Sequence, residues 1–96
     1  MPSWTPPRGA STELVSKWRQ FIDALRLHEA GHELDALNSA GRIADYLRAS
    51  PTNPTCSGLA ASIDAFGSKA IRSASAWDVH YDAVTDHGAT QGAVWP

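Results

Sequence analysis

A proline-free stretch over residues 11–49 constrains the fold of this chain more than any other feature. Its apolar residues recur at steps of three and four, which is the spacing of one face of an α-helix. Ser11 suits the start of such a helix, because its hydroxyl can accept a hydrogen bond from an unpaired N–H of the first turn. The sequence therefore predicts a long helix over residues 11–49. Its core-facing side is formed by Leu14, Trp18, Phe21, Leu25, His28, His32, Asp35, Ser39, Ile43 and Tyr46.

A second helix is predicted over residues 55–84. It follows a loop at residues 50–54, in which Asn53 suits the cap and Pro54 the first helical position. Residues 1–10 hold three of the six prolines and predict an extended lead-in, and residues 85–96 form a tail. We therefore expect a single all-α domain over residues 1–96. Its architecture would be an antiparallel pair of long helices with the extended N-terminal and C-terminal segments packed over it.

The composition excludes several classes of protein. Charged residues make up 19% and hydrophobic residues 43%, as in ordinary globular chains. The net charge is −2 and the basic residues are scattered, so we expect no nucleic-acid partner. No apolar run approaches the length of a membrane span, and no export signal begins the chain. Cys56 is the only cysteine, which excludes an internal disulfide and a cysteine-based zinc cage.

The pattern H-E-x-x-H lies within the first predicted helix, at residues 28–32. Two imidazoles four residues apart rise on the same side of a helix, where both can bind one metal ion. Glu29 follows the first histidine and would lie beside the open position of the metal, where it can take a proton from water. The sequence therefore predicts a zinc site with His28 and His32 as ligands and Glu29 as the general base.

A zinc site of this kind needs a third protein ligand. Straight antiparallel helices with a short loop would place residues 77–79 across from His28, which makes His80 the nearest candidate. His87 lies about two turns farther along and becomes available if the chain turns back. Asp35 is one turn beyond the motif on the same face, and it suits better a role in holding an imidazole N–H. Spacing narrowly favours His80 and leaves the choice open.

Three stretches of the chain occur in a characteristic order. They are W-T-P-P at residues 4–7, the H-E-x-x-H pattern preceded by Trp18 and Leu25, and Y-D-A-V-T-D-H-G-A-T-Q-G-A at residues 81–93. Together they resemble domain of unknown function 922, a bacterial family described as secreted zinc-dependent proteases. The last stretch is far more specific than H-E-x-x-H. The resemblance covers essentially the whole chain.

This resemblance implies that His87, rather than His80, is the third metal ligand. Asp82 and Thr85 belong to the same stretch and would orient His87 or shape its loop, while Gln91 could line the cleft. Tyr81 could stabilise an oxyanion, although its place on the apolar face favours packing. The implied substrate is a peptide or protein, and the implied location is secreted or periplasmic.

Members of the family resemble a longer domain, with strand-like sequence before the W-x-P-P stretch at which this chain starts. Edge strands commonly align the substrate of such peptidases by backbone pairing. We therefore expect that the chain binds zinc, whereas peptide hydrolysis would also need a means of aligning the substrate. Two alternatives remain open at this point. One is a non-catalytic helical interaction domain stapled by zinc. The other is a partial gene product whose helices pair with a missing sheet or with a second copy as a homodimer.

Overall fold

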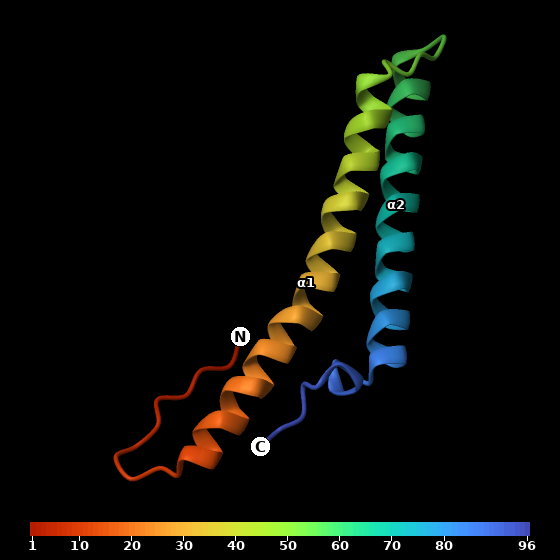
Figure 1. Cartoon of the computed structure of the whole chain (residues 1–96). Helices are drawn as coiled ribbons and strands as arrows, with labels where there is room; N and C mark the ends of the chain where they lie inside the picture. The colour runs from red at the N-terminus through yellow and green to blue at the C-terminus, as the bar shows by residue number, and fades with distance from the viewer. The chain divides into compact units, whose positions relative to one another are not determined.

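The computed structural model describes all 96 residues of the chain. Two long helices make up most of it: α1 over Thr12–Arg48 and α2 over Cys56–Thr85, followed by the short 3₁₀ turn η1 over Ala89–Gln91 (Figure 1). No strand is present, and the two helices pack against each other. The predicted all-α class is therefore confirmed, and each long helix begins and ends one residue from its predicted bounds.

Contacts between residues divide the chain into two compact units. The site unit comprises residues 1–32 and 80–96, and the hairpin unit comprises residues 33–79. Both long helices contribute to both units. The interpretation of the chain as a single domain stays a prediction, and each unit is described by itself below.

Side chains from the preceding loops cap the starts of both helices. The Ser11 hydroxyl accepts the backbone N–H of Leu14 at 3.1 Å, as predicted. At α2 the cap is Thr55, whose hydroxyl accepts the N–H of Gly58 at 3.0 Å. The prediction that Asn53 caps this helix is wrong, because Asn53 Oδ1 instead accepts the N–H of Thr55 at 3.1 Å. An Asn side chain that bonds the backbone two residues on forms a turn of its own, and this turn delays the helix start.

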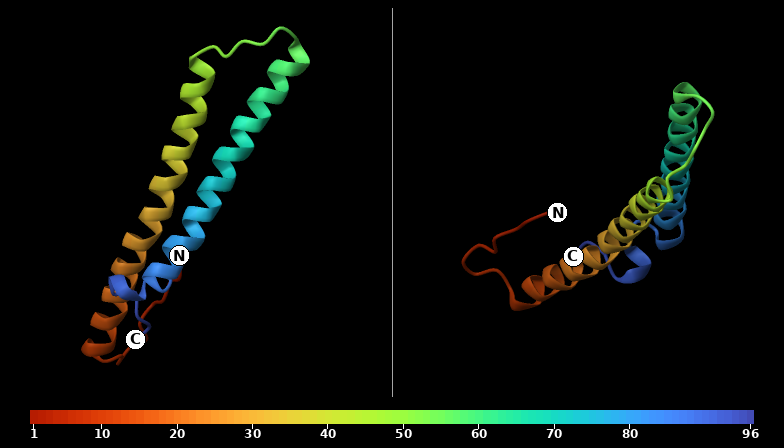
Figure 2. Two further views of the ribbon diagram at one scale, coloured as in Figure 1. Left: turned by 90° about the vertical axis from the view of Figure 1, so that its right-hand side faces the viewer. Right: turned by 90° about the horizontal axis from the view of Figure 1, so that it is seen from above.

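The hairpin unit joins the second part of α1 to most of α2 through residues 49–55. Its two helical segments run side by side in opposite directions (Figures 1 and 2). Tyr46 and Phe66 stack with ring centroids 4.1 Å apart and an angle of 6° between the rings. Ala70 of α2 is buried, and so is Ser39 of α1, whose hydroxyl accepts a hydrogen bond from Arg42. The predicted apolar faces are thus the ones that meet in this unit.

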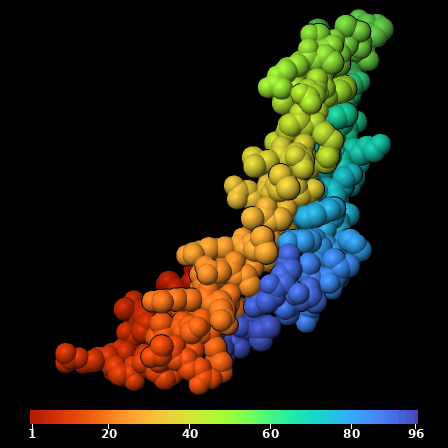
Figure 3. Space-filling model, viewed as in Figure 1, coloured from red at the N-terminus to blue at the C-terminus, as the bar shows by residue number.

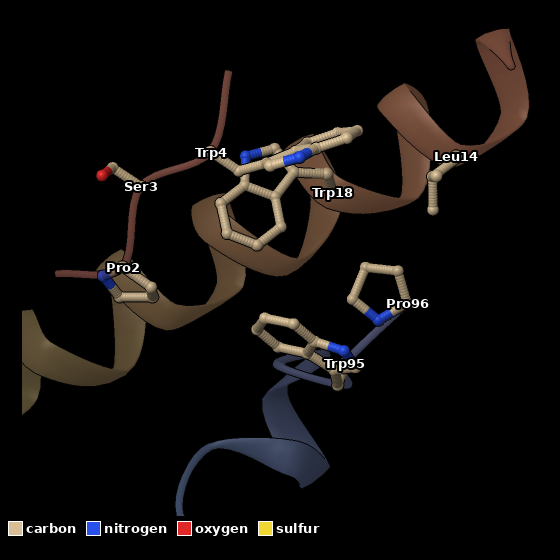
Figure 4. Close-up of a pocket in the computed structure, with 7 residues that line it drawn as sticks. All are labelled: Pro2, Ser3, Trp4, Leu14, Trp18, Trp95 and Pro96. Atoms are coloured by element: carbon tan, nitrogen blue, oxygen red, sulfur yellow. The ribbon is translucent and has the colours of Figure 1, made fainter. Parts of the chain in front are cut away.

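The site unit packs both chain termini against the first part of α1. The C-terminal segment lies against this part of the helix, where blue meets orange in Figure 3. Trp18 contacts Trp4 on one side and Trp95 on the other, with centroid distances of 5.6 and 5.7 Å. The three indoles line one pocket between the N-terminal segment, α1 and the tail (Figure 4). Edge-to-face aromatic contacts of this kind contribute about 0.5–1.5 kcal/mol beyond their buried area.

The hydrophobic core is small. Only Phe21, Ile22 and Ala70 are buried among the hydrophobic residues, and none is below 2% exposure. Large apolar side chains such as Leu27, Leu34 and Leu37 are about 60% exposed. None of the helices is long and apolar enough to cross a membrane. Polar contacts must therefore contribute a larger share of the packing here than in a domain with a full core.

Two glycines of α1 differ in what surrounds them, and this difference gives a matched test. A Cβ built on Gly31 would lie 2.6 Å from Cζ of Tyr81, whereas one built on Gly41 meets nothing within 4 Å. Alanine in a helix is favoured over glycine by about 1 kcal/mol.

Gly41→Ala should therefore raise the free energy of unfolding by up to about 1 kcal/mol. Gly31→Ala should lower it, because the Tyr81 ring would have to move. Urea denaturation of both variants measures the difference. Equal stabilisation by the two substitutions would show that Tyr81 does not require a glycine at position 31.

Candidate metal centre

Three side chains converge on one point within the site unit: His28 and His32 of α1, and Asp82 near the end of α2. The Nε2 atoms of both histidines approach the same carboxylate oxygen, Oδ1 of Asp82, at 3.1 and 2.7 Å. The potential ligand atoms all lie within 4.8 Å of one another. The H-E-x-x-H spacing accounts for the two imidazoles, whose ring centroids are 4.9 Å apart.

The point at which the three side chains meet is buried on the side of His28 and partly exposed on the side of His32 and Asp82. The side chain of His28 is 3% exposed, that of His32 is 23% exposed and that of Asp82 is 32% exposed. Two imidazole nitrogens and one carboxylate oxygen form a donor set that zinc accepts in catalytic sites, where a fourth position stays open to water. The residues present therefore fit a zinc ion by their chemistry and their spacing.

Charge around Asp82 favours its ionised form. Partial burial removes water and raises the pKa of Asp82, but the hydrogen bond from His32 opposes this effect. The charge of His32, the hydrogen bond with His28 and the charge of His87 act in the same direction as that bond. The net result is a pKa below the ordinary value of 3.8. A carboxylate held ionised in this way is ready to bind a cation.

The far side of the His28 ring is held by polar groups of the tail and of α2. Its Nδ1 lies 2.9 Å from Oε1 of Gln91 and 3.4 Å from the hydroxyl of Thr85. The Tyr81 ring stacks on His28 with a centroid distance of 4.8 Å and an angle of 6°. Nε2 of Gln91 donates to the Tyr81 hydroxyl at 3.0 Å. The imidazole is therefore bound at both nitrogens and packed on one face.

The end of α2 places Asp82 and turns the chain toward His28. The N–H of His87 donates to the carbonyl of Asp82 at 2.8 Å, and that of Asp86 donates to Ala83 at 3.4 Å. This pair of bonds is the Schellman motif that closes many helices. Asp86 and His87 have φ angles of 48° and 51°, and Gly88 has a φ of 91°. Three consecutive left-handed residues reverse the chain here.

Gly88 brings the reversed chain against the site. A Cβ built at this position would lie 3.0 Å from Cγ of His28. Thr85 stabilises the turn, because its hydroxyl donates to the carbonyl of Tyr81 at 2.7 Å and accepts the N–H of Gly88 at 3.2 Å. Glycine is thus required at position 88 both by the φ angle and by the contact with His28.

The two candidates for the third ligand are placed differently. Nδ1 of His87 lies 3.5 Å from Oδ2 of Asp82, and its side chain is 79% exposed. His87 therefore lies at the edge of the His28–His32–Asp82 group and contacts Oδ2 of Asp82, whereas His28 and His32 approach Oδ1. The side chain of His80 is exposed and has no hydrogen bond or ion pair. Neither histidine shares the point at which His28, His32 and Asp82 meet.

The remaining candidate residues are not among these ligand atoms. Glu29 is exposed on α1, directly after His28, and makes no hydrogen bond or ion pair. Asp35 belongs to the hairpin unit, where its Oδ2 is buried without a hydrogen-bond partner. Tyr81 packs on His28, and its hydroxyl is engaged with the carbonyl of His28 at 3.3 Å.

A family model described as "Bacterial protein of unknown function (DUF922)" matches residues 1–88 of the chain. The chain belongs to this family. The matched part of this DUF922 chain contains His28, His32, Asp82 and His87, and it ends before Gln91. No curated protein and no solved structure matches the chain.

The sequence predicts only part of the contacts that Asp82, Thr85 and Gln91 make around the two histidines. Thr85 does bond the loop of His87, since its hydroxyl accepts the N–H of Gly88, but the sequence does not predict that Thr85 and Gln91 also contact Nδ1 of His28. Asp82 lies beside His87, at 3.5 Å, and in addition meets both histidines of the helix motif, which the sequence does not predict. The Y-D-x-x-T spacing could have indicated this, because residues three or four apart share one face of α2.

The pKa of Asp82 gives a pH-dependent prediction for the metal-free protein. Because folding lowers this pKa below 3.8, ionised Asp82 stabilises the fold above that value. This stabilisation is lost as the pH falls through the folded pKa. In the presence of a chelator, the gap in unfolding free energy between wild type and Asp82→Asn should therefore be present above 3.8 and shrink below it. A carboxyl carbon of Asp82 that titrates above 3.8 in NMR spectra would contradict the prediction.

Proposed function

We propose that this protein is a zinc-dependent peptidase in which His28, His32 and Asp82 hold the metal. The observation that carries the proposal is the approach of both Nε2 atoms to one oxygen of Asp82, at 3.1 and 2.7 Å. Three ligand atoms this close need either a cation or shared protons between them. The H-E-x-x-H spacing of the two histidines supports a metal at this position.

Each residue of the site has a role in the proposed reaction. Zinc, when bound, would supply a Lewis acid that polarises a carbonyl and lowers the pKa of its bound water to about 7. Glu29, adjacent to His28 on α1, takes up the proton of the attacking water and delivers it to the leaving amine. Its exposure leaves the carboxylate accessible to solvent and substrate. His32 and Asp82 border the open side, so the substrate approaches over them.

His87 is the alternative third ligand that the family resemblance implies. Its side chain is 79% exposed, and its ring lies 3.5 Å from Asp82. In the proposed site it orients the second oxygen of Asp82, while the first oxygen faces the metal. Separate replacement of the two side chains distinguishes a ligand from a neighbour.

A second candidate function is a zinc-stapled helical domain without catalysis. The small core favours it, since only three hydrophobic residues are buried and several leucines are largely exposed. In such domains the free energy of metal binding becomes free energy of folding. Zinc binding is common to both candidates, so the metal is tested first and Glu29 second.

Wild-type protein should bind one zinc ion per chain, as measured by elemental analysis and calorimetric titration. Removing a ligand with His28→Ala or Asp82→Ala should weaken binding by more than the roughly 10–100-fold that follows loss of a group behind a ligand. His87→Ala should fall within that smaller range.

His80→Ala is the matched control, because His80 is exposed and unpaired and should keep full affinity. Wild-type protein that binds no zinc would refute the proposal. Loss of zinc in His80→Ala but not in Asp82→Ala would assign the third ligand to His80 instead.

Glu29→Gln tests the catalytic role. It should reduce cleavage of a fluorogenic peptide library by about 10²–10⁴-fold, since a general base is lost. Zinc content and thermal unfolding should stay at the wild-type level, because Glu29 is exposed and makes no hydrogen bond.

Glu33→Gln removes an equally exposed carboxylate of the same helix and should leave cleavage unchanged. Zinc-loaded wild type that cleaves no peptide would favour the zinc-stapled domain. A loss of stability in Glu29→Gln as large as that in His28→Ala would point the same way.

A further inference from the structure

We infer that Gln91 is a positioning residue that holds His28 in the tautomer carrying its proton on Nδ1, so that Nε2 presents a lone pair to the metal. This inference rests on the proposed function, because it concerns the same ligand. Gln91 comes from the tail, 63 residues away in sequence from His28. It touches neither His32 nor Asp82 among the contacts of the site.

The donors and acceptors around Tyr81 fix the orientation of the Gln91 amide. The Tyr81 hydroxyl donates its one proton to the carbonyl of His28 at 3.3 Å. At its contact with Gln91, at 3.0 Å, it must therefore accept, and the NH₂ group of Gln91 must donate. The amide oxygen of Gln91 then faces Nδ1 of His28 at 2.9 Å. A carbonyl oxygen only accepts, so Nδ1 carries the proton.

Thr85 gives the same assignment by a separate route. Its hydroxyl proton is used on the carbonyl of Tyr81 at 2.7 Å, which leaves only lone pairs to face Nδ1 of His28 at 3.4 Å. Two independent groups on this side of the ring are thus acceptors. A lone pair on Nδ1 would face an oxygen lone pair at each of them, and the side chain is 3% exposed, so water cannot compensate.

Asp82 is the competing acceptor. Its Oδ1 lies 3.1 Å from Nε2 and would draw the proton to that nitrogen. The ring cannot carry one proton and satisfy both sides. With the proton on Nδ1, the Nε2 lone pair and the Asp82 oxygen point at the same place, and either a metal ion or a second proton on the ring would bridge them. Gln91 therefore prepares His28 as a ligand, as groups behind metal-bound histidines commonly do.

The test combines NMR of the metal-free protein with calorimetric zinc titration. At a pH at which His28 carries one proton, ¹⁵N shifts of the wild-type ring should show Nδ1 protonated and Nε2 unprotonated. In Gln91→Leu the proton should move toward Nε2, and zinc affinity should fall about 10–100-fold. Gln91→Glu keeps an acceptor for the Nδ1 proton and should restore most of the affinity.

Gln20→Leu is the matched control, since Gln20 is exposed on α1 and contacts none of these groups. It should change neither the ¹⁵N shifts of His28 nor zinc binding. A purely structural role for Gln91 would reduce affinity equally in Gln91→Leu and Gln91→Glu, and would overturn the inference. Protonation of Nε2 in wild type would overturn it as well, and this measurement needs no variant.

The two proposals fail in different ways. Wild type that binds no zinc refutes the proposed function, while the ¹⁵N shifts still decide whether Gln91 selects the tautomer. Wild type that binds zinc together with a Gln91→Leu variant of equal affinity refutes only the role of Gln91.

Discussion

The clamp on the His28 ring is the interaction on which the rest of the site unit depends. Its two nitrogens join three segments of the chain: Nε2 reaches Asp82 on α2, Nδ1 reaches Gln91 in the tail, and the ring itself belongs to α1. In a protein with so few buried hydrophobic residues, this polar clamp and the indole contacts of Trp18 hold the tail against the helix. A buried polar atom left without any partner costs about 1–3 kcal/mol, so the groups around this ring matter for stability. Packing and the candidate chemistry therefore depend on the same side chain.

The turn after α2 positions the site through unfavourable backbone conformations. Asp86 and His87 both adopt left-handed backbone conformations without being glycines. Such conformations persist only where the surroundings enforce them, and they cluster at functional sites. Here the Schellman bonds and the hydroxyl of Thr85 enforce them. The reversed chain then brings Gly88 against His28 and sets Gln91 at the far side of the ring.

The sequence predicts the helices of this protein well and the contacts between them less well. Helical spacing identified both apolar faces, because a face depends only on local periodicity. The pairing of the helices depends on their packing angle and on the loop, neither of which local periodicity determines. The contacts of His28 on α2 are with Tyr81 and Asp82, which lie beyond residues 77–79. His80 then falls on an exposed face. The role of Gln91 was out of reach, since it depends on a non-local turn and on the donor and acceptor pattern around Tyr81.

The separation in sequence of the groups around His28 has a consequence for folding kinetics. Its partners Asp82 and Gln91 lie 54 and 63 residues away, so the site exists only after the chain has closed a long loop. Closing a loop of that length costs roughly 4 kcal/mol of chain entropy. Each helix can form from local contacts long before this closure takes place. The ligand group is therefore among the last parts of the chain to assemble, and an ion that binds there would slow unfolding more than it would speed folding.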